Sequence, residues 1–395
     1  MNLSFFYLIQ GVIDIMPKAV RPVGRPTVAE IDLKALAFNY HQIQRKIPKG
    51  VKILGVVKAD AYGHGSIPVS RKLEQLGVEY LGVAMSDEGV LLRKAGIQTP
   101  ILLLGGIYPE DVDWAFQFNL TPVVFQKESL HLLAGEAGKR RKRVRVHLKV
   151  DTGMGRLGVP LQLWPSFLDE VKRYPNIEIE GILSHYSMAD ETEDPFTRRQ
   201  WDSFQEAVAI AESAGIHFKY RHISNSAGLT AFPSWSGNLV RPGIILYGSY
   251  PSPAFRNLIK LKPVMTLKTR IGLLKQVPPG ERISYGGTYV TKKESLMATL
   301  PIGYADGYRR QLSNRGQVLI RGRRASVVGR VCMDYIIADV TDIPRVSPGD
   351  TVVLMGRQGR EEITAEEIAG NIGTISYEVL CLVGKRVPRV YKDEE

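Results

Sequence analysis

The chain has 395 residues, 44% of them hydrophobic, and a formal net charge of +12 at pH 7. This length favours two domains over one, and the apolar content is ample for two cores. The densest basic run, Lys139 to Arg143, precedes a predicted strand without zinc-ligand spacing, an RNA-binding signature or a basic helix, so we interpret it as a solvated loop and expect no nucleic-acid partner.

The N-terminal residues predict neither a membrane span nor a signal peptide. The apolar stretch 4–9 has no basic flank or cleavage site, and Gln10 and Asp14 follow it closely. We interpret residues 1–24 as a poorly ordered tail, with Met16 as an alternative start. Cys332 and Cys381 are too few for a disulfide framework, and their apolar, strand-like surroundings predict buried, reduced thiols and a cytoplasmic location.

Short apolar runs alternate with helical periodicity from Thr27 to about Ser252. Expected helices include one from Ser66, one over 87–95 and one over 196–214. The expected strands cover 53–57, 80–84, 101–105, 121–125, 144–150, 177–183, 221–224 and 240–247. Repeated units of this kind predict a (β/α)8 TIM-like barrel over 25–252, with an open doubly wound sheet as the alternative.

The pattern changes after Ser252, where short strands and scattered glycines replace helical periodicity. Turn signals occur at 278–280 and 347–350. The expected strands cover 264–274, 295–301, 317–320, 325–331 and 351–355. We therefore predict a C-terminal, mostly-β domain over 253–395, and an overall α/β fold class.

Lys58 directly follows the near-continuous apolar run 53–57, which is typical of a strand buried on both faces. It should therefore lie at the carboxyl end of a barrel strand, where barrel enzymes carry their catalytic groups. A desolvated lysine there could form a Schiff base with pyridoxal phosphate. On these grounds alone, a surface lysine after a strand remains an equal alternative.

The run Val56 to Gly65 closely resembles the cofactor-lysine signature of alanine racemases, and similar segments extend from about Ala29 to Tyr391. The resemblance implies an isomerase that interconverts L-alanine and D-alanine through an aldimine of pyridoxal 5'-phosphate, with no metal. It also implies that the product D-alanine is supplied for peptidoglycan.

The resemblance assigns roles to residues in the matching motifs. Lys58 and Tyr285 would be the two catalytic bases, on opposite faces of the planar carbanion. Arg156 and the Met333 amide would bind the substrate carboxylate, and Lys149, when carbamylated, would position Arg156. Besides Lys58, the cofactor-binding residues would be Tyr62, His185, Ser226, Arg241, Gly243, Ile244 and Tyr377. The entrance would be narrowed by Tyr304, Arg310, Arg330 and Ile375.

The resemblance also implies a head-to-tail homodimer with shared active sites, because Tyr285, Tyr304 and Met333 act on the partner's cofactor in that family. Two alternatives remain. One is a broad-specificity amino-acid or serine racemase on the same scaffold. The other is a non-catalytic pyridoxal-phosphate carrier, which residues 252–395 argue against because known barrel-only carriers lack a β domain.

Overall fold

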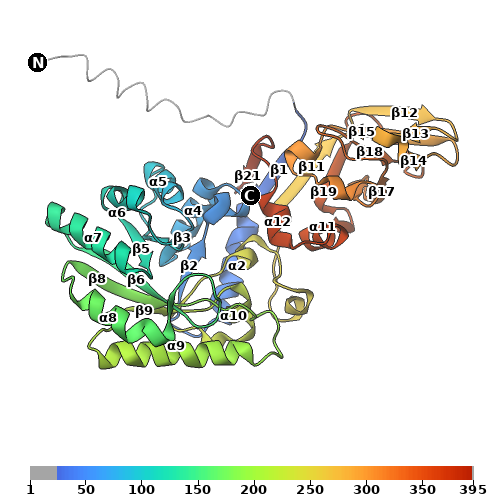
Figure 1. The fold of residues 1–395 in the computed structure, drawn as a ribbon. Helices are drawn as coiled ribbons and strands as arrows, with labels where there is room; N and C mark the ends of the chain where they lie inside the picture. Colours follow the sequence, from blue (N-terminus) through green and yellow to red (C-terminus); the bar gives the residue numbers. More distant parts are fainter. Residues whose placement is uncertain (1–24, 394–395) are drawn as a thin grey trace, which may run out of the picture.

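The computed structural model describes residues 25–393, which form a barrel and a second, mostly-β unit beside it (Figure 1). The expected tail, 1–24, and Met16 lie outside these residues. The predicted combination of a (β/α)8 barrel with a mostly-β unit is confirmed.

Within residues 25–393, eight parallel strands form the barrel in the order β10-β2-β3-β4-β5-β6-β8-β9. Their bounds are β2 (Lys52–Val56), β3 (Tyr80–Val83), β4 (Ile101–Leu103), β5 (Leu120–Val124), β6 (Val144–Asp151), β8 (Ile177–Leu183), β9 (Tyr220–His222) and β10 (Leu239–Val240). The short β7 (Val159–Pro160) pairs with β6. The Asn238 amide donates to the Arg221 carbonyl at 2.9 Å, which brings β10 and β9 together and nearly closes the barrel.

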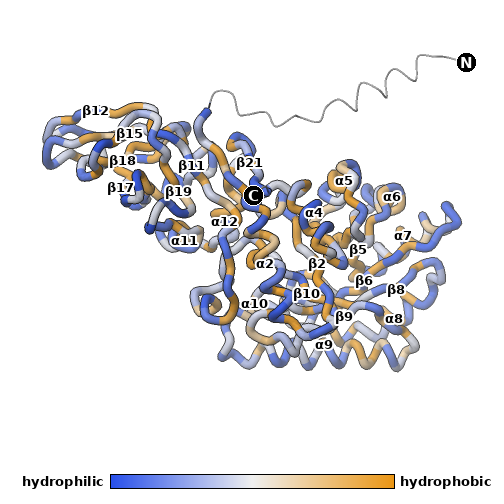
Figure 2. The backbone as a smooth tube through the Cα atoms, turned by 180° about the vertical axis from the view of Figure 1, so that it is seen from behind, coloured by the Kyte–Doolittle hydropathy of each residue, from blue (hydrophilic) through white to orange (hydrophobic). Residues whose placement is uncertain are grey.

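Amphipathic helices cover the outside of the barrel. Their bounds are α2 (Leu33–Lys46), α4 (Ser66–Gln75), α5 (Ser86–Lys94), α6 (Val112–Gln117), α7 (Lys127–Arg140), α8 (Trp164–Lys172), α9 (Phe196–Ser213) and α10 (Ser226–Ala231). In α9 the buried residues Gln200, Phe204, Ala207 and Ala211 recur every three or four positions, so polar and apolar colours alternate along it in Figure 2. This periodicity keeps one face of the helix on the strands.

Several segments differ from the sequence expectation, and the expected strand 264–274 is two strands, Met265–Arg270 and Leu273–Val277. The expected strand 240–247 is a strand only at Leu239–Val240, and Ile244–Tyr247 forms a 3-10 turn because Pro242 and Gly243 interrupt the extended chain. The basic run 139–143, expected as a loop, is only partly one: Lys139 and Arg140 end α7, where both pair with Glu136, and residues 141–143 form the turn and loop that follow.

The second sheet has the order β12-β15-β18-β17-β16-β19-β11-β1-β21, with β20 paired to β19. The bounds are β1 (Val28–Asp32), β11 (Met265–Arg270), β12 (Leu273–Val277), β15 (Ser295–Leu300), β16 (Gln317–Ile320), β17 (Arg323–Val327), β18 (Ile336–Asp339), β19 (Thr351–Gln358), β20 (Glu361–Ile363) and β21 (Arg389–Lys392). A separate hairpin joins β13 (Arg282–Ile283) and β14 (Tyr289–Val290). Two helices, α11 (Ala365–Ile372) and α12 (Ser376–Cys381), pack against each other. β1, the first described strand, belongs to the second sheet, because it pairs with β11 and β21 before α2 begins the barrel.

The expectation of two buried thiols in strands is wrong. Cys332 is half-buried in a loop, and Cys381 is exposed at the end of α12. Among the described residues, no helix is long and apolar enough to cross a membrane, and no cluster of side chains could hold a metal ion.

Candidate active site

Lys58 follows β2 after one residue, Val57, at the carboxyl end of the barrel, and begins the short left-handed turn α3 (Lys58–Tyr62). The next four residues, Ala59 to Tyr62, have φ between 52° and 54°. This conformation costs about 1–2 kcal/mol per non-glycine residue, so the surroundings must enforce it. The Glu88 carboxylate accepts from the Ala59 amide at 2.6 Å, and the Asp60 carboxylate accepts from the Ser66 amide at 2.7 Å.

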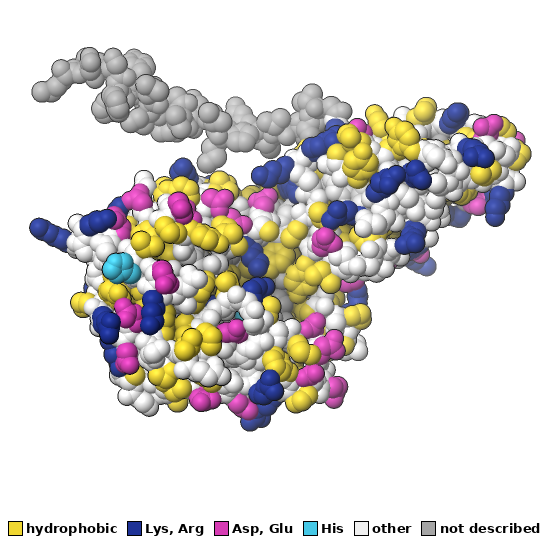
Figure 3. Space-filling view, in the orientation of Figure 1, with side chains coloured by type: hydrophobic (Ala, Val, Ile, Leu, Met, Phe, Trp, Pro, Cys, Tyr) yellow, Lys and Arg dark blue, Asp and Glu magenta, His cyan; other side chains and the backbone are white. Residues whose placement is uncertain are grey.

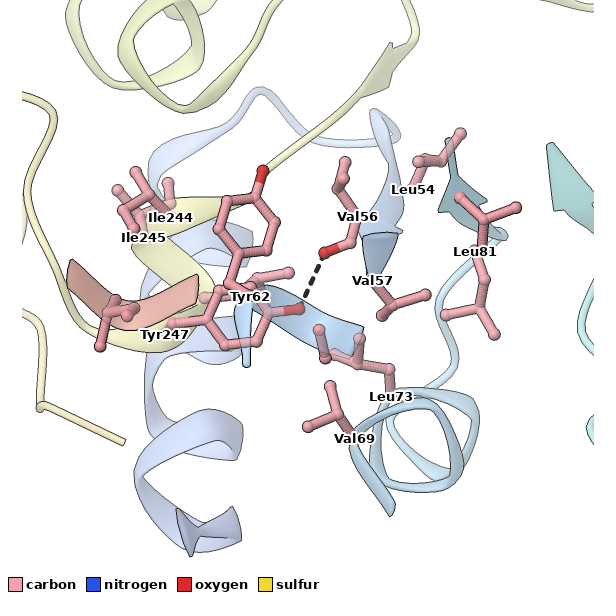
Figure 4. Close-up of a cluster of buried hydrophobic side chains, with 14 of the residues drawn as sticks. Leu54, Val56, Val57, Tyr62, Val69, Leu73, Leu81, Ile244, Ile245 and Tyr247 are labelled. Atoms are coloured by element: carbon pink, nitrogen blue, oxygen red, sulfur yellow. Dashed lines mark hydrogen bonds between the residues drawn. The ribbon is translucent and has the colours of Figure 1, made fainter. Parts of the chain in front are cut away.

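Aromatic side chains pack against this turn, and Figure 4 shows Tyr62 and Tyr247 beside Val56. The Tyr247 hydroxyl donates to the Val56 carbonyl at 2.8 Å, and the Tyr62 ring packs on Tyr247 at 4.9 Å. His64 stacks on Tyr247 at 4.6 Å, and its Nδ1 donates to the carbonyls of Ala61 and Tyr62 at 3.0 Å each. Burial lowers the pKa of His64 to about 4, so its imidazole is neutral at neutral pH.

The barrel mouth gathers positive charge, and Figure 3 shows Lys and Arg side chains in the hollow between the barrel and the second unit. Burial lowers the pKa of Lys58, and the charges of Arg156 and Arg241 lower it further, against an opposing effect from Glu88. Burial, Arg241 and Arg156 likewise lower the pKa of Lys149 to about 8. A less basic amine is more often unprotonated, which a nucleophilic lysine requires.

Arg241 follows β10 and is only 4% exposed. Its Nη2 donates to the Ser184 carbonyl at 2.7 Å, the Ile223 carbonyl at 3.0 Å and His185 Nδ1 at 3.0 Å. Its Nη1 donates to His222 Nδ1 at 2.9 Å. Burial lowers the pKa of Arg241 to about 9, which leaves the guanidinium protonated at neutral pH. Both imidazoles therefore accept at Nδ1, and burial and the Arg241 charge hold the pKa of His185 well below its ordinary value.

Ser226, Gly243 and Tyr62 converge beside this group. The Gly243 amide donates to Ser226 Oγ at 2.9 Å. A Cβ on Gly243 would lie 2.4 Å from the Tyr62 hydroxyl oxygen, so only glycine leaves that space open. Tyr377 approaches from α12 of the second unit, with its ring centre 6.2 Å from that of Tyr62. Hydroxyls and backbone amides of this kind suit a phosphate group.

Arg156 lies in the glycine-rich turn after β6 and is exposed. The Asp151 carboxylate holds this turn by accepting from the Gly153 amide at 2.9 Å and the Gly155 amide at 3.0 Å. The arginine side chain is thus presented at the rim, where its charge reaches Lys58 and Lys149.

The remaining candidates lie on the second unit, and most of them are exposed. Tyr285 is 71% exposed, and Met333 and Tyr304 are also exposed. The amides of Tyr304 and Ala305 donate to the carbonyls of Cys332 and Met333, which holds these segments together. The half-buried Arg330 lies against Gly286. Arg310 and Ile375 are also exposed.

One chain does not bring the two candidate bases together. Tyr285 lies between β13 and β14, which are at the end of the second unit remote from the barrel in Figure 1. Lys58 lies at the barrel mouth. The sequence-predicted residues therefore fall into two groups, one at the barrel rim, which Tyr377 joins from the second unit, and one exposed on the second unit.

Sequence reasoning missed several residues that build this site. Glu88 and His64 hold the left-handed turn, and His222 binds Arg241 directly. His64 stands inside the Lys58 motif, but no local pattern marks Glu88 as its support, because that contact joins residues 29 positions apart.

Comparisons with known proteins point to the same family for both units of the chain. Residues 31–251 match the family model of the alanine racemase N-terminal domain, and residues 264–391 match that of the C-terminal domain. A curated alanine racemase of Halothermothrix orenii is 49% identical over 372 residues, covering 94% of this chain and 98% of the relative. One of Geobacter sulfurreducens is 48% identical, covering 93% and 97%.

Solved structures show the same likeness. The alanine racemase of Clostridium difficile 630 has a TM-score of 0.89 at 40% identity, covering 94% of this chain and 96% of that one. That of Bacillus anthracis with bound L-Ala-P has a TM-score of 0.89 at 38% identity, with the same coverage. The chain therefore belongs to the alanine racemase family of isomerases, which interconvert L-alanine and D-alanine.

Proposed function

We propose that this chain racemises alanine with pyridoxal 5'-phosphate held at the barrel mouth, and that Lys58 and Tyr285 are its two bases. The position and surroundings of Lys58 are the observation that carries this proposal. It stands at a strand end on an enforced left-handed turn, and burial together with Arg156 and Arg241 lowers its pKa. A lysine so placed is suited to carry a carbonyl cofactor covalently.

The residues present fit this cofactor. The space kept open by Gly243, together with Ser226 Oγ, Tyr62, Tyr377 and the start of the Ile244 turn, would hold the phosphate. Arg241 is fixed by carbonyls and imidazoles and can only donate, so it would face an unprotonated ring nitrogen, with His185 beside the ring. When bound, pyridoxal phosphate supplies an electron sink that makes the alanine Cα proton removable.

The side chains then divide the work of proton transfer. Lys58 removes or returns the proton at Cα on one face, and Tyr285 does so on the other. Arg156 and the Met333 amide bind the alanine carboxylate. The lowered pKa of Lys149, about 8, leaves part of its amine uncharged and able to be carbamylated. A carbamate would replace a like charge next to Arg156 with an attractive one.

We propose that a head-to-tail homodimer completes each site. Tyr285, Tyr304 and Met333 are exposed on the second unit, and the β13–β14 hairpin that carries Tyr285 lies remote from the barrel in Figure 1. A second copy could offer these residues to the barrel mouth. Arg310, Arg330 and Ile375 would then narrow the entrance. The reaction would take place in the cytoplasm and supply D-alanine for peptidoglycan.

Subunit exchange tests both the bases and the sharing. Lys58→Ala and Tyr285→Phe homodimers should each lose activity by about 10²-fold or more. After mixing and exchange, half of the dimers are mixed and each has one complete site, so about a quarter of wild-type activity should return.

Lys52→Ala, at the exposed start of β2, and Tyr108→Phe, on the barrel surface, are matched controls that should stay active. Borohydride reduction followed by peptide mass analysis should find the cofactor on Lys58. If exchange is demonstrated and no activity returns, the shared site is wrong. A fully active Tyr285→Phe homodimer would refute the role of Tyr285.

A further inference from the structure

A buried polar column leads from Arg241 away from the site and through the barrel. His222 Nε2 lies 2.8 Å from His147 Nδ1, and His147 Nε2 lies 3.6 Å from a Glu180 carboxylate oxygen. Both histidines are fully buried, and Glu180 is 8% exposed. His147, Glu180 and His222 come from the neighbouring strands β6, β8 and β9. Barrel closure therefore assembles the column.

Every proton in this column has one consistent position. Arg241 can only donate, so His222 Nδ1 accepts and its proton is on Nε2. That proton is donated to His147 Nδ1, so the His147 proton is also on Nε2, facing Glu180. Burial lowers the pKa of both histidines, which keeps each with a single ring proton. All donors thus point from the arginine towards the carboxylate.

Glu180 is held as an anion at the far end of the column. Burial would raise its pKa, but the polar hydrogens of His147 and Tyr80 outweigh burial and bring the pKa to about 2. The Tyr80 hydroxyl donates to Glu180, and Lys219 Nζ lies 3.6 Å from the other carboxylate oxygen. The separation of 3.6 Å between His147 and Glu180 exceeds a hydrogen bond, so their attraction is chiefly electrostatic.

The backbone makes room for this arrangement. A Cβ on Gly181 would lie 2.6 Å from His147 Nδ1, the atom that accepts from His222. The strand register also shifts beside it, between Val146 and His147. No carboxylate contacts Arg241 directly among residues 25–393, where its partners are carbonyls and imidazoles. Glu180 is the carboxylate at the end of the series of contacts that starts at Arg241 and passes through His222 and His147.

We propose that Glu180 is a positioning residue, whose carboxylate stabilises the same proton positions of His147 and His222 that donation by Arg241 requires, and so holds Arg241 as an oriented donor at the active site. This inference rests on the proposed function, because the orientation of Arg241 matters for catalysis only if a cofactor nitrogen lies against it. The proton positions themselves do not depend on catalysis and can be measured separately.

Two readouts test the proposal on the purified protein. The chain has 7 histidines, so 15N-histidine labelling gives a tractable imidazole spectrum. In the wild type, His147 and His222 should both be protonated only at Nε2. Glu180→Gln removes the charge at constant shape. It should populate the Nδ1-protonated form of His147, and it should lower kcat about three- to thirtyfold with little change in KM.

Glu178→Gln is the matched control, because Glu178 lies on the same strand and makes no ion pair among the described residues. It should leave both readouts at wild type. Should Glu180→Gln fail to fold, Glu180→Asp and Glu180→Asn form a second pair of equal size, in which only the aspartate should keep the Nε2-protonated pattern and the higher kcat. Unchanged proton positions and kcat in an active Glu180→Gln enzyme would overturn the proposal. A wild type without racemase activity would instead overturn the proposed function.

Discussion

His64 should make the protein sensitive to acid. Its imidazole is fully buried, with a pKa of about 4 against 6.5 for a free histidine. Between these values the unfolded chain binds a proton that the folded chain excludes, so stability is complete above pH 6.5 and falls as the pH drops towards 4. By linkage, this one group should remove about 2.5 kcal/mol of unfolding free energy between pH 7.5 and pH 4.5.

The substitution His64→Asn isolates this effect. An asparagine amide can donate from the same δ position to the carbonyls of Ala61 and Tyr62 but does not titrate. Loss of the stacking on Tyr247 should lower stability at every pH by a similar amount. The pH dependence is therefore the informative quantity, and urea unfolding followed by circular dichroism at both pH values measures it.

The variant should lose about 2.5 kcal/mol less than the wild type over this pH interval. Other buried histidines add to the acid sensitivity of both proteins and cancel in the difference. The exposed His217, changed to Asn, is the control and should keep the wild-type dependence. Equal losses in wild type and His64→Asn would show that the fold does not hold His64 neutral.

Two further substitutions probe the phosphate space and the second unit. Gly243→Ala would place a Cβ 2.4 Å from the Tyr62 hydroxyl, so affinity for pyridoxal phosphate, measured by absorbance titration, should fall about tenfold or more; Gly135→Ala, with open space around its Cβ, should bind normally. Asp306→Ala removes a buried carboxylate that accepts from Arg25 at 2.5 and 2.6 Å and from the Gly303 amide at 2.9 Å. It should cost about 3 kcal/mol in urea unfolding, and a loss below about 1 kcal/mol would contradict a structural role.

The parts predicted well from sequence are those whose signal is local. An apolar run ending in Lys58 is enough to predict a strand end at the barrel rim, because period and punctuation reflect burial and turns. The change of pattern near Ser252 likewise marked a mostly-β unit. The end of the strand before Pro242 and Gly243 was harder to predict, since the apolar residues 244–247 suit a buried 3-10 turn as well as a strand.

The features that could not be predicted depend on contacts between distant residues. The left-handed turn at Ala59 to Tyr62 contradicts local preference and exists because Glu88 and the Tyr247 ring hold it. β1 joins the second sheet by pairing with β11 and β21, which lie more than 230 residues further along the chain. No window of sequence contains either pairing.

The strained turn also explains how one lysine can be placed so accurately. An ordinary βα-loop after Val56 could move, whereas four left-handed residues persist only while Glu88, Asp60 and the aromatic rings packed against them are all in place. The second unit adds to this restraint, because Arg389 donates to the Gly63 carbonyl at 2.9 Å. These contacts offset strain of about 1–2 kcal/mol per residue and thus hold a single backbone conformation at Lys58. The unit that carries Tyr285 therefore also helps to hold the Lys58 turn of its own chain, so the two units depend on each other even though their candidate bases lie far apart.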